Sequence, residues 1–181
     1  MSQSNEPQST ATELPYDVVL AAIHHGTHVC AFYETEDDLL DIVGQFCAAG
    51  VRRRDLCLWL MPEGVNAESV ASIGVELHSA AAIYQQGGAF ESGPMVAFWL
   101  EKLSQALAHD CNGLCASGHT RWLQQRDWQA FMAYENYLNA VIADKPISLL
   151  CTYPLSACKA GDILDVVRAH KVVLAKQDKR W

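Results

Sequence analysis

The order of apolar segments along the chain is the feature that most constrains its fold. Six short apolar runs alternate with longer segments in which apolar residues recur every three or four positions. Continuous apolar runs are typical of strands covered on both faces, as in parallel sheets, and the longer segments are typical of amphipathic helices. The expected strands are residues 28–33, 56–61, 80–84, 113–116, 147–152 and 172–175. The expected helices are residues 36–49, 67–73, 94–109, 125–143 and 160–169.

This alternation predicts a single three-layer α/β/α domain with a mainly parallel sheet, because right-handed crossovers place helices on both faces. The length of 181 residues fits one domain. Residues 1–16 are rich in Ser, Gln, Thr, Glu and Pro and predict a disordered tail, which leaves 17–181 as the folded domain. Thr35 is the expected N-cap of the first helix and Gly50 its expected C-cap.

The charge and the cysteines limit where the protein works and what it binds. Thirteen basic and 21 acidic residues give a net charge of −8, which argues against direct binding to nucleic acid. Seven cysteines, scattered singly and odd in number, make a poor disulfide framework and favour a reducing compartment. The N-terminus does not resemble a signal peptide, and no apolar run is long enough to span a membrane. We therefore expect a cytoplasmic protein that does not bind membranes.

The motifs of several common chemistries are missing from the sequence. There is no G-x-x-x-x-G-K-[ST] loop for a nucleoside triphosphate, no G-x-G-x-x-G after the first expected strand, and no G-x-S-x-G nucleophile elbow. The sequence identifies no cofactor. Chemistry driven by nucleotide hydrolysis is therefore not expected.

The residues that follow the expected strands predict a ligand site. In open α/β sheets, ligands bind beyond the carboxyl ends of the strands. Aromatic and polar side chains are concentrated at these positions, as a pocket for a small molecule requires. The candidates at this edge are Tyr33, Tyr84, His119, Trp122 and Tyr153.

Glu135 is the sixth candidate, because it lies in the middle of an apolar helical stripe. At about 100° per residue it falls between the positions of Phe131, Met132, Leu138 and Ile142. A carboxylate there must be paired, hydrogen-bonded, protonated or directed into a cavity, since an isolated buried charge is too costly. Two interpretations remain open: a buried structural hydrogen bond, or contact with a ligand.

Two further groups have alternative interpretations. His24, His25, His28 and Cys30 lie within seven residues, and His28 and Cys30 would point to one face of a strand, so a metal site is possible there. Their spacing matches no closed zinc pattern, however, which favours a histidine cluster without metal. His170 follows the last helix, where it is expected to satisfy terminal helix carbonyls.

Eight sequence pieces, in order between about residues 24 and 175, resemble the MEDS domain, the methanogen/methylotroph DcmR-type sensory domain of prokaryotic regulators. They are HVCAFYE at 28–34, FCAAGV at 46–51, LCLWL at 56–60, residues 82–84 with 88–90, Gly113-Leu114 with Gly118 and Trp122, YENYLN at 134–139, LCTY at 150–153 and VRAH at 167–170. The resemblance implies a RecA/KaiC-like domain without a phosphate-binding loop that senses hydrocarbon-derived small molecules. Family members often carry a DNA-binding or kinase domain after the sensor. Because this sequence ends at Trp181, we expect it to signal through another polypeptide.

Three hypotheses follow from the sequence. The first is a non-enzymatic module that binds a small molecule and signals to a kinase or transcription regulator, with a homodimer as the default assembly. The second is an enzyme in which Glu135, with a raised pKa, is a general base assisted by His119 or a cysteine. The third is a metal- or redox-responsive regulator that uses His24, His25, His28 and Cys30.

Overall fold

One parallel sheet contains all six strands of the residues that the structure describes. The structure is a computed structural model, and it describes residues 19–20, 22–85 and 90–175. The strand order is β3-β2-β4-β5-β1-β6, and every neighbouring pair is parallel. The strands are β1 (Thr27–Tyr33), β2 (Leu56–Met61), β3 (Glu76–Ser79), β4 (Leu114–His119), β5 (Ile147–Pro154) and β6 (Val172–Ala175).

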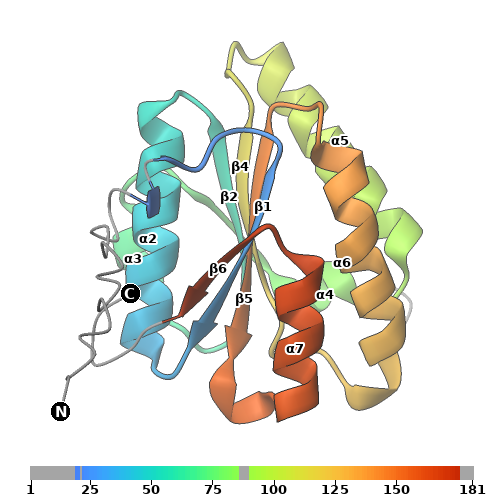
Figure 1. Cartoon of the computed structure of the whole chain (residues 1–181). Coiled ribbons are helices and arrows are strands. Elements are labelled where there is room, and N and C mark those ends of the chain that lie inside the picture. The colour runs from blue at the N-terminus through green and yellow to red at the C-terminus, as the bar shows by residue number, and fades with distance from the viewer. Residues whose placement is uncertain (1–18, 21, 86–89, 176–181) are drawn as a thin grey trace, which may run out of the picture.

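Helices cover both faces of this sheet and make three layers (Figure 1). The helices α2 (Glu36–Arg52) and α3 (Glu68–Ala71) lie on one face. The other face carries α4 (Ala80–Tyr84), α5 (Ser92–Ala108), α6 (Trp128–Ile142) and α7 (Ala160–Ala169). Short 3₁₀ turns at Gln125–Asp127 and Leu155–Ala157 follow β4 and β5. The fold class expected from the sequence, a three-layer α/β domain with a parallel sheet, is confirmed.

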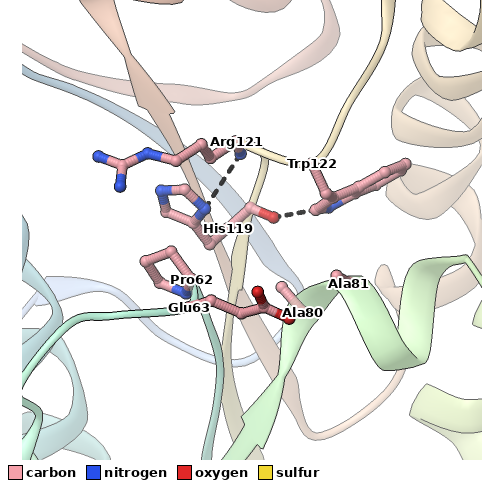
Figure 2. Close-up of a pocket in the computed structure, with 7 residues that line it drawn as sticks. All are labelled: Pro62, Glu63, Ala80, Ala81, His119, Arg121 and Trp122. Atoms are coloured by element: carbon pink, nitrogen blue, oxygen red, sulfur yellow. Dashed lines mark hydrogen bonds between the residues drawn. The ribbon is translucent and has the colours of Figure 1, made fainter.

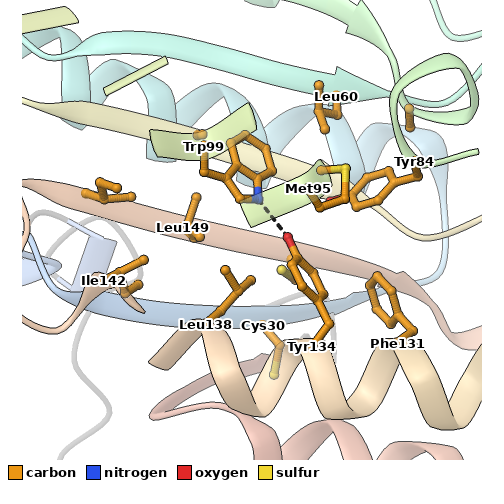
Figure 3. Packing of buried hydrophobic residues seen from close by; sticks show 14 of the residues in the cluster. Cys30, Leu60, Tyr84, Met95, Trp99, Phe131, Tyr134, Leu138, Ile142 and Leu149 are labelled. Carbon is orange, nitrogen blue, oxygen red and sulfur yellow. Dashed lines mark hydrogen bonds between the residues drawn. The ribbon is translucent and has the colours of Figure 1, made fainter. Parts of the chain in front are cut away.

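Two hydrophobic cores fill the space between the sheet and its helices. Every residue of β1, β4 and β5 is buried, which explains why these strands read as continuous apolar runs. The core under α5 and α6 contains most of the large aromatic side chains (Figure 3). Within it, the Trp99 indole Nε1–H donates to the Tyr134 hydroxyl over 2.7 Å, so both polar atoms are satisfied without water.

The strand expected at 80–84 is wrong, because these residues form the helix α4. The strand in this part of the chain is β3, which precedes α4 directly. β3 is an edge strand that pairs only with β2, and its residues are half-buried or exposed, so it lacks the apolar run that marks the other strands. Ser79 ends β3 and caps α4 by accepting the Ala82 amide.

Gly50 is not a C-cap, because α2 continues to Arg52. A Cβ at position 50 would lie 2.6 Å from Cys115 Sγ and 2.8 Å from Cys57 Sγ, so only glycine lets the helix approach the sheet this closely. Arg54, with φ at 64°, makes the turn after the helix instead. The predicted N-cap is confirmed: Thr35 and Asp38 form a reciprocal capping box. The tail expected at 1–16 lies outside the described residues.

Candidate functional site

A pocket of about 160 Å³ opens at the carboxyl edge of the sheet, between the ends of β2 and β4 (Figure 2). Such a site follows from the topology, because the carboxyl ends of parallel strands meet at one edge. The loop after β2, the start of α4 and the residues after β4 form its walls. Its lining residues are Pro62, Glu63, Ala80, Ala81, His119, Arg121 and Trp122. Sequence reasoning had placed His119 and Trp122 at such a site.

His119 is held in one orientation by hydrogen bonds to both ring nitrogens. The Arg121 backbone N–H donates to Nδ1 over 3.0 Å, so the neutral ring carries its proton on Nε2 and donates it to the Tyr33 hydroxyl, 2.6 Å away. Burial, together with the nearby Arg121 charge, lowers the pKa of His119 to about 3. The pocket therefore presents a neutral imidazole at physiological pH.

Trp122 is fixed at the wall of the pocket by a hydrogen bond and by aromatic stacking. Its indole Nε1–H donates to the His119 carbonyl over 2.8 Å, and its ring stacks on Tyr84 at a centroid distance of 4.6 Å. Tyr84 is buried and lies with its hydroxyl directly over Gly118, where any side chain would collide with it. Tyr84 thus supports the pocket wall from behind without lining the pocket.

Charged groups of both signs stand at the mouth of the pocket. Glu63 and Arg121 are exposed, whereas Pro62 and Ala80 are buried, so the base of the pocket is apolar. Sequence reasoning did not include Arg121, Glu63, Ala80 or Ala81 among the site residues. Glu63 lies in the Pro-Glu-Gly sequence directly after β2, a position that could have indicated it, whereas the wrongly predicted strand at 80–84 concealed the two alanines.

Tyr153 lies away from this pocket, in the layer of the sheet that faces α6 and α7. It is buried and borders a second hollow of about 120 Å³, lined with Thr120, Trp128 and Cys158 among others. Burial raises the pKa of Tyr153 well above its usual value. The six ligand candidates therefore divide into three groups. His119 and Trp122 line the first pocket, Tyr33 and Tyr84 contact these two without lining it, and Tyr153 and Glu135 lie elsewhere.

Glu135 is fully buried in a cluster with two histidines and a cysteine. Its Oε2 lies 2.8 Å from His170 Nε2 and 3.4 Å from His28 Nε2, and its Oε1 lies 3.7 Å from Cys151 Sγ. The centroids of the His28 and His170 rings are 4.1 Å apart. The carboxylate at the middle of the apolar stripe is thus paired, as the cost of burying a lone charge requires.

The pairing sets the charge of each group in this cluster. Burial opposes ionisation of Glu135, but its close contacts with His170 and His28 outweigh burial and hold the pKa of the carboxyl well below its usual range. Burial also opposes a charge on His170, yet its contacts with Cys151, Cys30 and Glu135 raise its pKa well above 6.5. Burial and the His170 charge lower the pKa of His28. Burial and the Glu135 charge raise the pKa of the Cys151 thiol to about 12.

These shifts bear on the hypothesis of an enzyme with Glu135 as its base. That hypothesis requires a carboxyl with a raised pKa within reach of a substrate. Glu135 has a lowered pKa and is fully buried against His170 and His28. The geometry favours an internal ion pair over a general base.

The histidines and the cysteine near the N-terminus do not come together. His24 Nδ1 contacts the Thr27 hydroxyl, and His25 Nε2 contacts the Asp55 carboxylate, each over 2.9 Å. His28 and Cys30 do share a face of β1, and both contact other groups: His28 meets Glu135, and Cys30 meets His170. His170 also caps α7 as expected, since its Nδ1 lies 2.8 Å from the Val166 carbonyl.

The amino end of α2, where a phosphate-binding loop would lie, is closed to anions. Only Glu34 and Thr35 connect β1 to α2, and Glu36, Asp37 and Asp38 occupy the first turn of the helix. These carboxylates interact favourably with the positive end of the helix dipole, and their negative charges repel phosphate. The amino end of α2 therefore disfavours bound phosphate groups.

Within the described part of the chain, no helix has the length and apolar character to cross a membrane.

The chain is thus a three-layer α/β domain with a parallel sheet, a pocket at the carboxyl edge of that sheet, and no G-x-x-x-x-G-K-[ST] loop in its sequence. Residues 27–171 match the family model described as MEDS, the methanogen/methylotroph, DcmR sensory domain. This match covers most of the chain, and the protein belongs to the MEDS family.

Comparisons with individual proteins add little to the family match. One similar solved structure is the flagellar accessory protein FlaH from Methanocaldococcus jannaschii, with 9% sequence identity and a TM-score of 0.48 over 84% of this chain and 72% of that chain. No match was found among the curated proteins.

Proposed function

We propose that this chain is a sensory module that binds a small, largely apolar molecule in the pocket between β2 and β4 and reports the binding to a regulator. Membership of a sensory-domain family supports the general role. The observation that carries the proposal is the pocket itself, which stands where open α/β sheets bind ligands and is walled by Trp122 and the neutral His119.

The size and lining of the pocket limit the ligand. A cavity of about 150 Å³ accommodates a molecule as large as benzene, and this pocket has about 160 Å³. Both nitrogens of His119 and the Trp122 indole N–H already have partners, so few polar groups remain for a ligand except Glu63 and Arg121 at the mouth. The fitting class is a small hydrocarbon derivative with one polar group directed toward the mouth.

The pocket is connected to two other parts of the sheet edge, which supports a role in signalling. His119 contacts Tyr33 at the end of β1, and Trp122 stacks on Tyr84 in α4. A ligand that moves Trp122 or His119 would therefore move α4 or the start of the β1–α2 connection. We propose that a separate kinase or transcription regulator reads this change, with the sensor acting in the cytoplasm and without contacting DNA itself.

A pair of variants on one helix tests the binding site. Ala81 lines the pocket and Ala82 is exposed beside it on α4, so Ala81→Leu fills the pocket while Ala82→Leu serves as its control. The probes are short-chain alcohols, halomethanes and alkylamines, measured by saturation-transfer NMR with the purified full chain. Native mass spectrometry of the same sample detects any molecule that co-purifies.

We expect wild type and Ala82→Leu to bind at least one probe class, and Ala81→Leu to lose that binding while its melting temperature stays near that of wild type. Equal binding by both variants would contradict the proposed pocket. Binding of none of the probes, with no co-purified molecule, would also count against it.

A further inference from the structure

Four metal-ligating side chains from four separate elements meet at one point between the sheet and the helices α6 and α7. They are His28 of β1, Glu135 of α6, Cys151 of β5 and His170, which follows α7. One ligand atom from each lies within 4.8 Å of the others, and no second group of this kind exists among the described residues. From this convergence we infer that the cluster is a binding site for one divalent transition-metal ion, with zinc as the best fit. This site is separate from the proposed ligand pocket.

The spacing of the ligand atoms is close to that of a tetrahedral site. Zinc bonds of about 2.0–2.3 Å to nitrogen, oxygen and sulfur place neighbouring ligand atoms about 3.3–3.8 Å apart. In the cluster, His28 Nε2 lies 3.4 Å from Glu135 Oε2 and 3.4 Å from Cys151 Sγ, and Cys151 Sγ lies 3.7 Å from Glu135 Oε1. The His170–Glu135 Oε2 contact, at 2.8 Å, is shorter than these three distances, and Cys151 contacts the other oxygen of the carboxylate. An ion requires that contact to open by about half an ångström, a shift within reach of two side chains.

The donor set and its charge also suit such an ion. Two imidazoles, a thiolate and a carboxylate are all ligands that zinc accepts, and softer thiolate ligands disfavour magnesium and calcium. With both imidazoles neutral, the thiolate and carboxylate carry two negative charges, which a divalent cation balances. A balanced site is important here because the side chains of His28, Glu135 and His170 are fully buried.

The surroundings orient His170 as metal sites orient a ligating histidine. His170 directs Nδ1 to the Val166 carbonyl at 2.8 Å, which leaves Nε2 toward the cluster. A ligating histidine that donates its other nitrogen to a carbonyl is the usual arrangement around zinc. Asn139 donates to the Ala169 carbonyl over 2.7 Å and so holds the end of α7, where His170 begins its turn toward β6. The closed, buried geometry is that of a structural site.

Cobalt is the probe that reports the ligands directly. The full chain, untagged so that no added histidines bind metal, is stripped with a chelator in mild denaturant and titrated with Co²⁺. We expect one equivalent to bind and to produce the visible bands of tetrahedral cobalt together with a near-ultraviolet thiolate-to-cobalt charge-transfer band. Metal analysis of the freshly purified protein should find close to one zinc or other transition-metal ion per chain.

Substitutions identify which side chains ligate the metal ion. Cys151→Ser should abolish the charge-transfer band and weaken cobalt binding by at least about 10-fold, while Cys158→Ser, outside the cluster, should leave both unchanged. The double variant His24→Gln/His25→Gln should also bind like wild type, and loss of binding in it would overturn the assignment. If Cys151→Ser does not fold, the absorption spectrum of the cobalt-loaded wild-type protein still tests the proposal. A wild-type protein that is purified without metal and gives no charge-transfer band would overturn the proposal, whatever the outcome for the ligand pocket.

Discussion

The Tyr33 hydroxyl and His119 Nε2 are 2.6 Å apart and join the carboxyl ends of β1 and β4 across the intervening strand β5. Both side chains are buried on the face of the sheet that α2 covers. The bond fixes the ring that forms one wall of the pocket. It also ties the folding stability of the domain to the pH, because His119 is buried as a neutral imidazole.

The first prediction concerns acid stability. The pKa of His119 is about 3 in the folded protein, against about 6.5 when unfolded. Its contribution to stability is therefore fully present above pH 6.5 and is lost as the pH falls toward 3, since the unfolded chain takes up the proton first. Between pH 6.5 and 4.5 this loss amounts to at most about 2–3 kcal/mol. Urea denaturation of wild type and His119→Gln at both pH values measures the difference.

His119→Gln should lose less stability than wild type over that interval, because glutamine does not titrate. His28, whose pKa is also lowered, contributes equally to both proteins and cancels in the comparison. Equal losses in the two proteins would show that His119 is not buried as a neutral ring.

Removal of the Tyr33 hydroxyl should destabilise the fold. In Tyr33→Phe, the Nε2–H of His119 loses its partner in a buried position, which costs about 1–3 kcal/mol. Tyr137→Phe is the matched control, because Tyr137 is 57% exposed on α6 and its hydroxyl should contribute less than about 0.5 kcal/mol. Chemical denaturation at pH 7 compares the free energies of unfolding of Tyr33→Phe and Tyr137→Phe with that of wild type. If they lost the same stability, the Tyr33–His119 bond would have no energetic role.

Glu135→Gln should be among the more damaging single substitutions in the domain. Removing the carboxylate leaves His170 buried without its ion partner, and breaking a buried pair costs about 3–5 kcal/mol. Glu101→Gln, on the exposed face of α5, changes the same group without this cost. The free energy of unfolding of both variants is measured by chemical denaturation of chelator-treated protein. Ligand binding should fall only as far as folding does, and a selective loss of binding in folded Glu135→Gln would return Glu135 to the ligand site.

ATP should not bind appreciably. The β1–α2 connection, Glu34 and Thr35, has no lysine to pair with a triphosphate, and the Thr35 hydroxyl already accepts the Asp38 amide. Glu36, Asp37 and Asp38 occupy the first turn of the helix and repel phosphate. Isothermal titration calorimetry with Mg-ATP should give no binding below millimolar concentration. Micromolar affinity would show that this sheet edge still accepts nucleotides.

Most of the fold could be predicted from the sequence because strands buried on both faces leave a strong signal. The segments that form β2 and β6 were predicted at their observed bounds. The failure at 80–84 has a local cause: Ala-Ala-Ala-Ile-Tyr is apolar throughout and too short to show helical periodicity, so it resembles a buried strand, although only Ala80 and Tyr84 are buried in α4. The true edge strand β3 has the sequence ELHS and shows no such run.

The candidate functional residues were only partly predictable, because both the pocket and the buried Glu135 cluster are assembled by tertiary contacts. Helical periodicity alone placed Glu135 in the apolar stripe and left open whether it makes a structural hydrogen bond or contacts a ligand. It could not identify His28, Cys151 or His170, which come from β1, β5 and the end of α7. At the sheet edge, the position of His119 after a strand was informative, whereas Ala81 carries no chemical signal and is found only through the shape of the pocket.

The position of the ligand can be tested most directly at the Trp122 indole. In a ¹⁵N-labelled protein the Nε1–H of Trp122, bonded to the His119 carbonyl, and that of Trp99, bonded to Tyr134, give separate signals that Trp122→Phe and Trp99→Phe assign. On titration with the hydrocarbon derivative that binds best, the proposal predicts a saturable shift of the Trp122 signal while the Trp99 signal stays in place. Binding that leaves the Trp122 signal unmoved would contradict the proposed sensory pocket.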